Sequence, residues 1–385
     1  MTQTTKPTLF ALKRKFMAVA LFATLAGCGL APYAVNSQAG APALAETGRV
    51  YALTPDADGP ENLRRSAQDL GYEPDTAINL PALGLVMVPV DIPQDVTGKQ
   101  AIDALEDAVP GSTVGVNHAY QLQATAASTD RRTFANSLIN WPTGGCRAVT
   151  AIGLIDGGVA QNALSEGDTV LNRRNFVEPS AGGLRHGTET ASVLADPSRM
   201  KNVVLYSANV VTRDKDGFDQ AGAASIVEAL NWLVASGVRV ANVSLAGPPN
   251  KLLAQAVDAA SARGLVLVAA AGNDRRVAAL QYPAALPSVV AVTAVDARQK
   301  IHPTAVRGGH IDFAAPGVDI FVGAQDTGRF VSGTSLAAPF VSALLATQTE
   351  TDPKVLVDAS VDLGRPGKDS IFGHGLIQAD AVCGG

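Results

Sequence analysis

Four polar residues in the sequence each stand beside glycine or other small residues. They are Asp156 in IGLIDGGV, His186 in RHGTETASVLA, Asn273 in VAAAGND and Ser335 in SGTSLAAP. A serine hydroxyl attacks a carbonyl carbon when an imidazole removes its proton, and a carboxylate can hold that imidazole in place. A carboxamide can donate to the oxyanion that forms. These four side-chain types together predict acyl transfer.

Each of these residues also has an ordinary structural explanation, such as a helix cap for Ser335. Their order along the chain and their neighbours favour the catalytic interpretation, because Asp, His and Ser follow the order found in subtilisin. Over residues 138–383 the sequence resembles the subtilisin-like serine peptidases (subtilases). The resemblance implies that Ser335 is the nucleophile, His186 the base, Asp156 the orienting acid and Asn273 the oxyanion donor.

The resemblance also implies where substrate binds. The segment NVSLAG is similar to the family's extended segment that pairs with the substrate backbone, and AAAGND to its oxyanion segment. The expected substrate-binding residues are Ser244, Leu245, Ala246, Gly247, Ala271 and Gly272. We expect no cofactor and no metal site, because no Cys/His cluster has zinc-like spacing. Calcium stays possible, but ADPSRMKNVVL is shorter than the loop that binds calcium in many relatives.

Three residues depart from the family pattern. Gly157 follows Asp156 where subtilases usually have Ser or Thr, and losing a hydrogen bond to a charged group costs about 1.5–3 kcal/mol. Ala246 stands where Gly is common, which would crowd the substrate strand. Gln281 stands where a Gly often floors the primary specificity pocket, which indicates a shallower or polar pocket. We predict a serine endopeptidase; the alternative is a catalytically weakened or silent subtilase-like binding protein of the cell envelope.

The elements that would position these residues are apolar strands alternating with helices. Strands are predicted at 148–156, 203–211, 238–247, 265–273 and 289–297, and helices at 223–237 and 250–264. Near-continuous apolar strands separated by helices predict an α/β domain at 138–385 with a parallel sheet covered on both faces. Ligands bind at the carboxyl ends of such strands, where Asp156, Ser244 and Asn273 stand.

A smaller α+β unit is predicted before this domain. Strands are expected at 49–54, near 76–80, at 83–90 and at 112–123, with helices at 60–71 and 97–109. The order β-α-β-β-α-β is the ferredoxin-like pattern. Many subtilases carry such a propeptide, which implies that residues 48–123 chaperone and inhibit the enzyme. Its last residues, 119–123, would then lie in the cleft; the alternative is a permanent accessory domain.

The segment between the two units is predicted to be an exposed linker. Residues 124–137 are small and polar, which suits proteolytic nicking. We therefore expect self-cleavage of a precursor somewhere within residues 123–137.

The N-terminus is predicted to be a targeting segment. Three basic residues precede an apolar run at 16–26. The run is shorter than the roughly 20 residues that a helix needs to span a bilayer, but its length suits a signal peptide. The following Leu-Ala-Gly-Cys resembles the lipobox of bacterial lipoproteins. That resemblance implies a signal peptide at 1–27, lipidation of Cys28 and a flexible tether at 28–47. The alternative is an ordinary secretory signal that is cleaved after Ala45.

Composition and cysteine content fit an exported enzyme. The net charge of −5, without runs of one sign, indicates no nucleic-acid partner. The expected partners are protein or peptide substrates, the chain's own propeptide and a membrane reached through the lipid. The expected location is the bacterial cell envelope, anchored and facing the periplasm, or outside the cell after processing. Cys146 and Cys383 form an even pair that suggests a disulfide, with two free thiols as the alternative.

Overall fold

The computed structural model describes residues 44–55, 59–122, 125–126, 134–164, 168–275, 279–323 and 328–383. All of them belong to one compact body, Pro42–Gly385. Within it we call the part before strand β6 (Ala119–Leu122) the first or small unit and the rest the larger unit. The predicted signal peptide at 1–27, Cys28 and most of the tether at 28–47 lie outside the described residues, as does most of the predicted processing segment.

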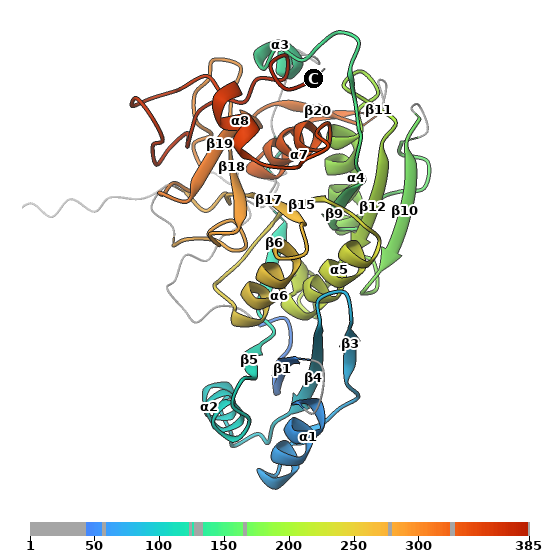
Figure 1. The fold of residues 1–385 in the computed structure, drawn as a ribbon, viewed down its shortest axis with the longest axis vertical. Coiled ribbons are helices and arrows are strands. Elements are labelled where there is room, and N and C mark those ends of the chain that lie inside the picture. Colours follow the sequence, from blue (N-terminus) through green and yellow to red (C-terminus); the bar gives the residue numbers. More distant parts are fainter. Residues whose placement is uncertain are drawn as a thin grey trace, which may run out of the picture. The chain divides into compact units, whose positions relative to one another are not determined.

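The first elements form an antiparallel sheet with two helices (Figure 1). In chain order they are β1 (Arg49–Pro55), α1 (Gly59–Asp69), β2 (Glu73–Pro74), β3 (Ile78–Leu80), β4 (Leu85–Asp91), α2 (Gly98–Ala108) and β5 (Thr113–Val116). The strand order is β2-β4-β1-β5, and β3 pairs with β4. Helix α2 begins after Thr97, whose hydroxyl accepts from the backbone of Gln100 in a capping box.

The main sheet is built from parallel strands. They are β9 (Ile152–Asp156), β10 (Val170–Asn175), β12 (Val204–Asn209), β15 (Val240–Val243), β17 (Val266–Ala270), β18 (Val289–Val295) and β19 (Ile311–Pro316). Their order is β10-β12-β9-β15-β17-β18-β19, and every neighbouring pair is parallel. The predicted α/β fold is confirmed. The order reverses direction around β9, so a crevice is expected at its carboxyl end.

Helices cover both faces of this sheet, as Figure 1 shows. The long helices are α4 (Ala181–Leu194), α5 (Ala223–Ala235), α6 (Lys251–Ser261) and α7 (Thr334–Leu345). The side chains of β9 alternate between the two cores: Ile152 and Leu154 pack with residues of α4 and α7, whereas Ile155 packs with residues of α5 and α6. Burial on both faces explains why the strands are apolar throughout.

The first sheet also has two buried faces. One face packs on α1 and α2. The other contributes Tyr51, Leu53 and Met87 to the core that contains α5 and α6. Polar contacts join the same surfaces, since Lys251 Nζ lies 3.0 Å from a carboxylate oxygen of Glu106. The small unit is therefore packed on the helices of the larger one.

The strand predicted at 112–123 is wrong as a single element. The structure divides it into β5 and β6 (Ala119–Leu122), which belong to different sheets. Strand β6 pairs with β14 (Asp219–Gly222) and β16 (Leu245–Ala246), and β14 pairs in turn with β13 (Val211–Arg213). At the break the His118 N–H donates to the carbonyl of Val116 at 3.1 Å, and this tight turn separates the two strands.

The predicted linker at 124–137 contains two short elements. Strand β7 (Thr125–Ala126) pairs with β21 (Arg329–Ser332), and β21 also pairs with β20 (Ile320–Val322). Helix α3 (Phe134–Leu138) follows. Strands β10 and β19 were likewise not predicted. The remaining short elements are β8 (Cys146–Arg147), β11 (Met200–Lys201) and α8 (Lys354–Ala359).

The structure contains the expected disulfide. Cys146 and Cys383 are bonded, with their Cα atoms 5.6 Å apart. The bond ties the region before β9 to the end of the chain. Within the described ranges, no helix has both the length and the apolar character needed to cross a membrane.

Candidate active site

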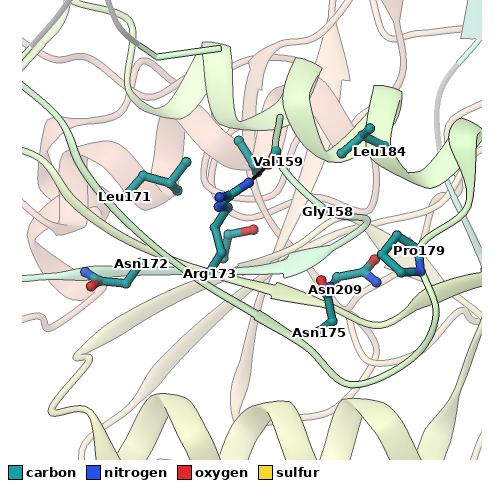
Figure 2. A pocket seen from close by; sticks show the side chains of 10 residues that line it. Gly158, Val159, Leu171, Asn172, Arg173, Asn175, Pro179, Leu184 and Asn209 are labelled. Carbon is teal, nitrogen blue, oxygen red and sulfur yellow. Dashed lines mark hydrogen bonds between the residues drawn. The ribbon is translucent and has the colours of Figure 1, made fainter. Parts of the chain in front are cut away.

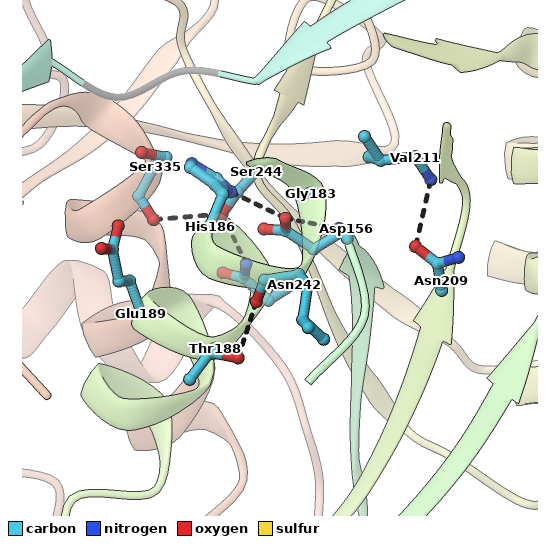
Figure 3. A network of polar contacts seen from close by, with 12 residues as sticks. Asp156, Gly183, His186, Thr188, Glu189, Asn209, Val211, Asn242, Ser244 and Ser335 are labelled. Atoms are coloured by element: carbon cyan, nitrogen blue, oxygen red, sulfur yellow. Dashed lines mark hydrogen bonds and ion pairs between the residues drawn. The ribbon is translucent and has the colours of Figure 1, made fainter. Parts of the chain in front are cut away.

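The predicted acid and base meet at the carboxyl end of β9 (Figure 3). Asp156 ends β9 and His186 lies in α4; the Nδ1 atom of His186 is 2.7 Å from Oδ1 of Asp156. A carboxylate only accepts, so Nδ1–H is the donor and Nε2 carries the lone pair. Both side chains are buried, and His186 Nε2 has no hydrogen-bond partner among the described residues. The imidazole is therefore held in the tautomer that a base requires.

The predicted nucleophile lies in the first turn of α7. Ser335 is fully buried, and its Oγ has no hydrogen-bond partner within the described part of the chain. The structure thus contains no hydrogen bond from Ser335 Oγ to the base. Catalytic hydrogen bonds often form only when substrate is bound. A buried hydroxyl and a buried imidazole nitrogen that both lack partners among the described residues are suited to that later bond.

Pro339 explains how Ser335 is joined to the substrate strand. A proline has no N–H, so the carbonyl of the residue four positions earlier loses its helical donor. That residue is Ser335, and its carbonyl accepts instead from Ser244 Oγ at 3.0 Å. Asn242 Nδ2 donates to Ser244 Oγ at 2.9 Å, and Ser342 Oγ donates to Asn242 Oδ1 at 3.1 Å. The buried network fixes the start of α7 against the end of β15.

The predicted oxyanion donor is held by the residue before Ser335. Asn273 Oδ1 accepts from the backbone N–H of Thr334 at 3.2 Å and from its hydroxyl at 3.3 Å. Thr334 Oγ1 also accepts from the N–H of Gly272 at 3.1 Å. Both contacts use Oδ1 as the acceptor, so they fix the orientation of the Asn273 amide and point its donor, Nδ2, away from Thr334. Sequence reasoning missed Thr334, although the Gly-Thr-Ser step contains it; it also missed the buried network partners Asn242 and Ser342.

Gly157 is required by packing. A Cβ at this position would lie 1.9 Å from the carbonyl oxygen of Gly183 in α4, and one at Gly187 would lie 2.2 Å from the carbonyl oxygen of Gly157. The Gly157 N–H donates to Asp156 Oδ1 at 2.6 Å. The backbone therefore supplies a hydrogen bond to the carboxylate, and the absence of a side chain lets α4 approach. The expectation that Gly157 only removes a bracing hydroxyl is incomplete.

A second buried carboxylate lies one turn beyond the base. Glu189 makes a two-pronged ion pair with Arg329 of β21, at 2.7 and 2.9 Å. Burial lowers the pKa of His186, but the charge and hydrogen bond of Asp156 and the charge of Glu189 raise it, so the pKa lies above its ordinary value. Arg329 lowers the same pKa. Neither Glu189 nor Arg329 was predicted: Glu189 stands in the histidine motif but received no role there, and Arg329 stands in no motif.

The predicted substrate strand is occupied by the chain itself. Strand β6 lies between β14 and β16, so Leu245 and Ala246 pair with residues of β6. Gly247 is covered by the buried ring of Tyr120, whose Cδ1 would be 2.5 Å from a Cβ at Gly247. Tyr120 also donates its hydroxyl hydrogen to the carbonyl of Pro248 at 3.1 Å. An extended peptide therefore fits between β14 and β16.

A separate pocket lies beside the loop that follows Asp156. It has a volume of about 540 Å³ and, as Figure 2 shows, the Arg173 side chain extends between its walls. One Arg173 N–H donates to the carbonyl of Val159 at 3.3 Å. The lining residues are Gly158, Val159, Leu171, Asn172, Arg173, Asn175, Pro179, Leu184, Ser207 and Asn209. None of the predicted site residues is among them.

No cluster of three or more His, Cys, Asp or Glu side chains in the described ranges is arranged to hold a metal ion. The predicted lipidation site, Cys28, lies outside those ranges.

Comparisons with known proteins agree on one family. Residues 150–375 match the family described as the subtilase family. The chain is 33% identical to Subtilisin BL of Lederbergia lenta over 221 residues, which are 53% of this chain and 80% of that protein. It is 29% identical to the Minor extracellular protease Epr of Bacillus subtilis over 263 residues, 63% of this chain. The match spans only 39% of the length of Epr.

Solved structures share the fold. Fervidolysin from Fervidobacterium pennivorans, described as a keratinolytic enzyme related to subtilisin, matches with a TM-score of 0.66 at 19% identity. This match covers 89% of this chain and 62% of that one. The epidermin leader peptide processing serine protease of Staphylococcus aureus matches with a TM-score of 0.63 at 18% identity, over 86% of this chain and 97% of that one.

Proposed function

The chain belongs to the subtilase family of serine endopeptidases, and we propose that it hydrolyses peptide bonds in proteins or peptides through an acyl-enzyme on Ser335. The observation that carries this proposal is the buried pair of Asp156 and His186, joined at 2.7 Å. Nε2 of His186 and Oγ of Ser335, which have no hydrogen-bond partner among the residues that the structure describes, support it.

The reaction follows from the roles of these atoms. His186 Nε2 takes the proton of Ser335 Oγ while Oγ bonds to the substrate carbonyl carbon. The oxyanion accepts from Asn273 Nδ2 and from the N–H of Ser335, one of the first N–H groups of α7 that have no partner within the helix. The imidazolium then protonates the leaving amine as the C–N bond breaks. Water repeats the sequence to release the acid, and Asp156 stabilises each imidazolium.

We further propose that the first unit is a propeptide that inhibits the enzyme until it is cut off. Its sheet buries one face against α5 and α6, which suits a folding chaperone. Strand β6 occupies the groove between β14 and β16, which suits an inhibitor. The alternative, a permanent accessory domain, makes no use of a strand in the substrate groove.

The pairing of β6 and β7 limits where the proposed self-cleavage could occur. Strand β6 ends at Leu122 beside the strand that follows Ser244, and β7 begins at Thr125 beside β21, which leads directly to α7 and Ser335. The two flanks thus pair with the two segments that frame the nucleophile. We place the cut between Leu122 and Thr125, within the segment predicted from the sequence.

Export and anchoring complete the proposal. We propose that a signal peptide at 1–27 directs the chain out of the cytoplasm and that Cys28 receives lipid. The name of the relative Epr, an extracellular protease, supports export. The test of the anchor is membrane fractionation of Cys28→Ser, which should move the unprocessed chain to the soluble fraction. Unchanged fractionation would refute lipidation.

The decisive experiment compares the exported full chain with Ser335→Ala. The wild type should be shortened by about the length of the propeptide and should react with a fluorophosphonate probe. The Ser335→Ala chain should stay at full length and unlabelled, because it lacks the hydroxyl that both reactions need. Wild-type chain that is neither shortened nor labelled would establish the alternative, a silent subtilase-like binding protein.

A further inference from the structure

Gln281 is a buried polar side chain between the two segments that would hold substrate. It is 9% exposed. Its Oε1 lies where it would be 1.9 Å from a Cβ at Gly272, in the oxyanion segment. The next residue, Tyr282, exchanges two backbone hydrogen bonds with Gly247, at 2.9 and 3.0 Å, at the end of the substrate strand. Gln281 therefore lies where these two segments come together.

The hydrogen bonding of Gln281 is incomplete. Its Nε2 donates to the carboxylate of Asp274, so the amide orientation places Oε1 as the remaining acceptor. That Oε1 is buried and has no partner in the described ranges. A buried carbonyl without a donor is unfavourable and requires an explanation, and a hydrogen bond supplied by a bound ligand is one. Oε1 of Gln281 and the carboxylate of Asp274 both offer acceptors to a donor from outside.

The register of β6 indicates which substrate residue reaches this place. Residues 121 and 122 pair with Ala246 and Leu245, in antiparallel order. A substrate strand that continues this register by one residue lies opposite Ser244, whose Oγ contacts the Ser335 carbonyl. The residue at that position presents its carbonyl carbon to Ser335. In that arrangement its side chain would fall on the side of Gly272 and Gln281, because the residue after Gln281 pairs with Gly247 at the end of the same strand.

We infer that Gln281, together with Asp274, makes this enzyme select a residue with side-chain N–H donors, glutamine or lysine, immediately before the scissile bond. The inference rests on the proposed peptidase function and adds its substrate class. Glutamine and lysine place N–H donors at the end of a long stem, where Oε1 of Gln281 needs one. Large aromatic residues are excluded because the Gln281 side chain fills space that a glycine would leave open. Acidic residues are excluded by repulsion from Asp274.

The sequence contains an internal substrate of this class. The residue that follows β6 is Gln123, within the interval proposed for self-cleavage. The inference therefore assigns the processing bond to Gln123–Ala124, and the mature chain should begin at Ala124. N-terminal sequencing of the processed protein reads this directly, and a start at Gln123 or Thr125 would contradict it.

The main test uses coumarin peptides Ala-Tyr-Gln-Leu-X, which copy residues 119–122 and vary X. For the processed wild type, kcat/KM for X = Gln or Lys should exceed that for X = Phe or Glu by roughly 30-fold or more, because a site built to bond a donor rejects side chains that lack one. Equal rates, or fastest cleavage after Phe, would overturn the inference.

Two variants test whether the Gln281 side chain causes this selectivity. Gln281→Gly should lower kcat/KM for the peptide with X = Gln and raise kcat/KM for the peptide with X = Phe, each by roughly 10-fold. Gln281→Met keeps the length but removes both polar atoms, so the preference for Gln and Lys should disappear without a gain for Phe. Fluorophosphonate labelling of Ser335 serves as the matched control. Absent labelling of the wild type would count against the peptidase function, whereas intact labelling with the wrong ranking would count against the selectivity alone.

Discussion

Gly157 shows how one residue can be fixed by a neighbouring backbone. The carbonyl of Gly183 in α4 occupies the place that a Cβ on Gly157 would need. The helix that carries His186 can therefore approach the end of β9 only because residue 157 has no side chain. A Ser or Thr at this position would push α4 away from Asp156, so the packing of α4 on the end of β9 requires glycine here.

We predict that Gly157→Ser, which restores the family's residue, lowers activity instead of raising it. Displacing α4 moves the imidazole relative to Ser335, and a shift of about 1 Å in a catalytic group costs on the order of 10²-fold in rate. The measurement is kcat/KM with a coumarin peptide. Gly158→Ser is the control, since a Cβ there would meet no atom closer than 3.4 Å, and it should stay within a few-fold of the wild type.

The ion pair between Glu189 and Arg329 acts on the pKa of one residue, His186. Asp156, Glu189 and Arg329 are the charged residues that act on His186, from β9, α4 and β21, and Ser335 of α7 is the neutral group beside them. Asp156 and Glu189 raise the pKa of His186, and Arg329 lowers it. In the proposed mechanism His186 is active when neutral, so activity should rise with pH through a pKa above the ordinary value for histidine.

This arrangement predicts opposite pH shifts for the two partners. Glu189→Gln removes a negative charge and leaves Arg329 in place, so the pKa of His186 should fall and the acid limb of kcat/KM should move to lower pH. Arg329→Gln should move that limb to higher pH. Lys368→Gln, which breaks a different ion pair with Asp312, is the control. Shifts of the same sign in both variants would show that the pair acts only on packing.

At the scale of elements, β6 connects the two units. The chain leaves the first sheet after β5, where Asn250 Nδ2 donates to the carbonyl of Val116 at 2.7 Å. The side chain of Asn117 then accepts from the N–H of Ala224 at 3.2 Å. Both bonds come from helix starts of the larger unit. They replace the ladder partners that a continuous strand would have, and they direct Tyr120 over Gly247.

We predict that Tyr120→Ala weakens inhibition by the propeptide. A buried aromatic anchor at the centre of an interface contributes about 2–4 kcal/mol, so active enzyme should appear sooner after processing of the full chain. The measurement is the lag before peptide hydrolysis. Tyr120→Phe loses only the bond to Pro248 and should give a smaller change, near 1 kcal/mol. An unchanged lag in Tyr120→Ala would mean that the Tyr120 side chain contributes nothing to inhibition.

The elements also show how far sequence reasoning reaches. The apolar strands β9, β12, β15, β17 and β18 and the helices α5 and α6 were predictable from periodicity. Strand β10 was missed because its sequence, VLNRRN, is polar, as an edge position permits. At the site, motifs predicted four chemical groups, and the structure brings two of them, Asp156 and His186, into contact. The bond from Ser244 to Ser335 was not predictable, because it depends on the carbonyl that Pro339 releases and on which strand lies beside α7.

At the scale of the whole molecule, the disulfide and the two cores hold the larger unit together. The bond between Cys146 and Cys383 closes a loop across 237 residues of sequence. Constraining an unfolded chain over such a loop stabilises the folded state by about 5 kcal/mol in the chain-entropy account. The first unit shares a core with α5 and α6 but has no cysteine among its described residues, so after the proposed cut only non-covalent contacts would retain it there.

The position of the disulfide has a consequence for where the enzyme acts. Both cysteines lie after the proposed cut, whereas Cys28 lies before it. In the proposed scheme the lipid therefore stays with the propeptide, and no covalent bond links the membrane to the processed enzyme. The bilayer would keep the spent inhibitor, while the catalytic unit diffuses away as soon as it dissociates. The lifetime of the complex would then set both the delay before activity and the distance from the cell surface at which proteolysis begins.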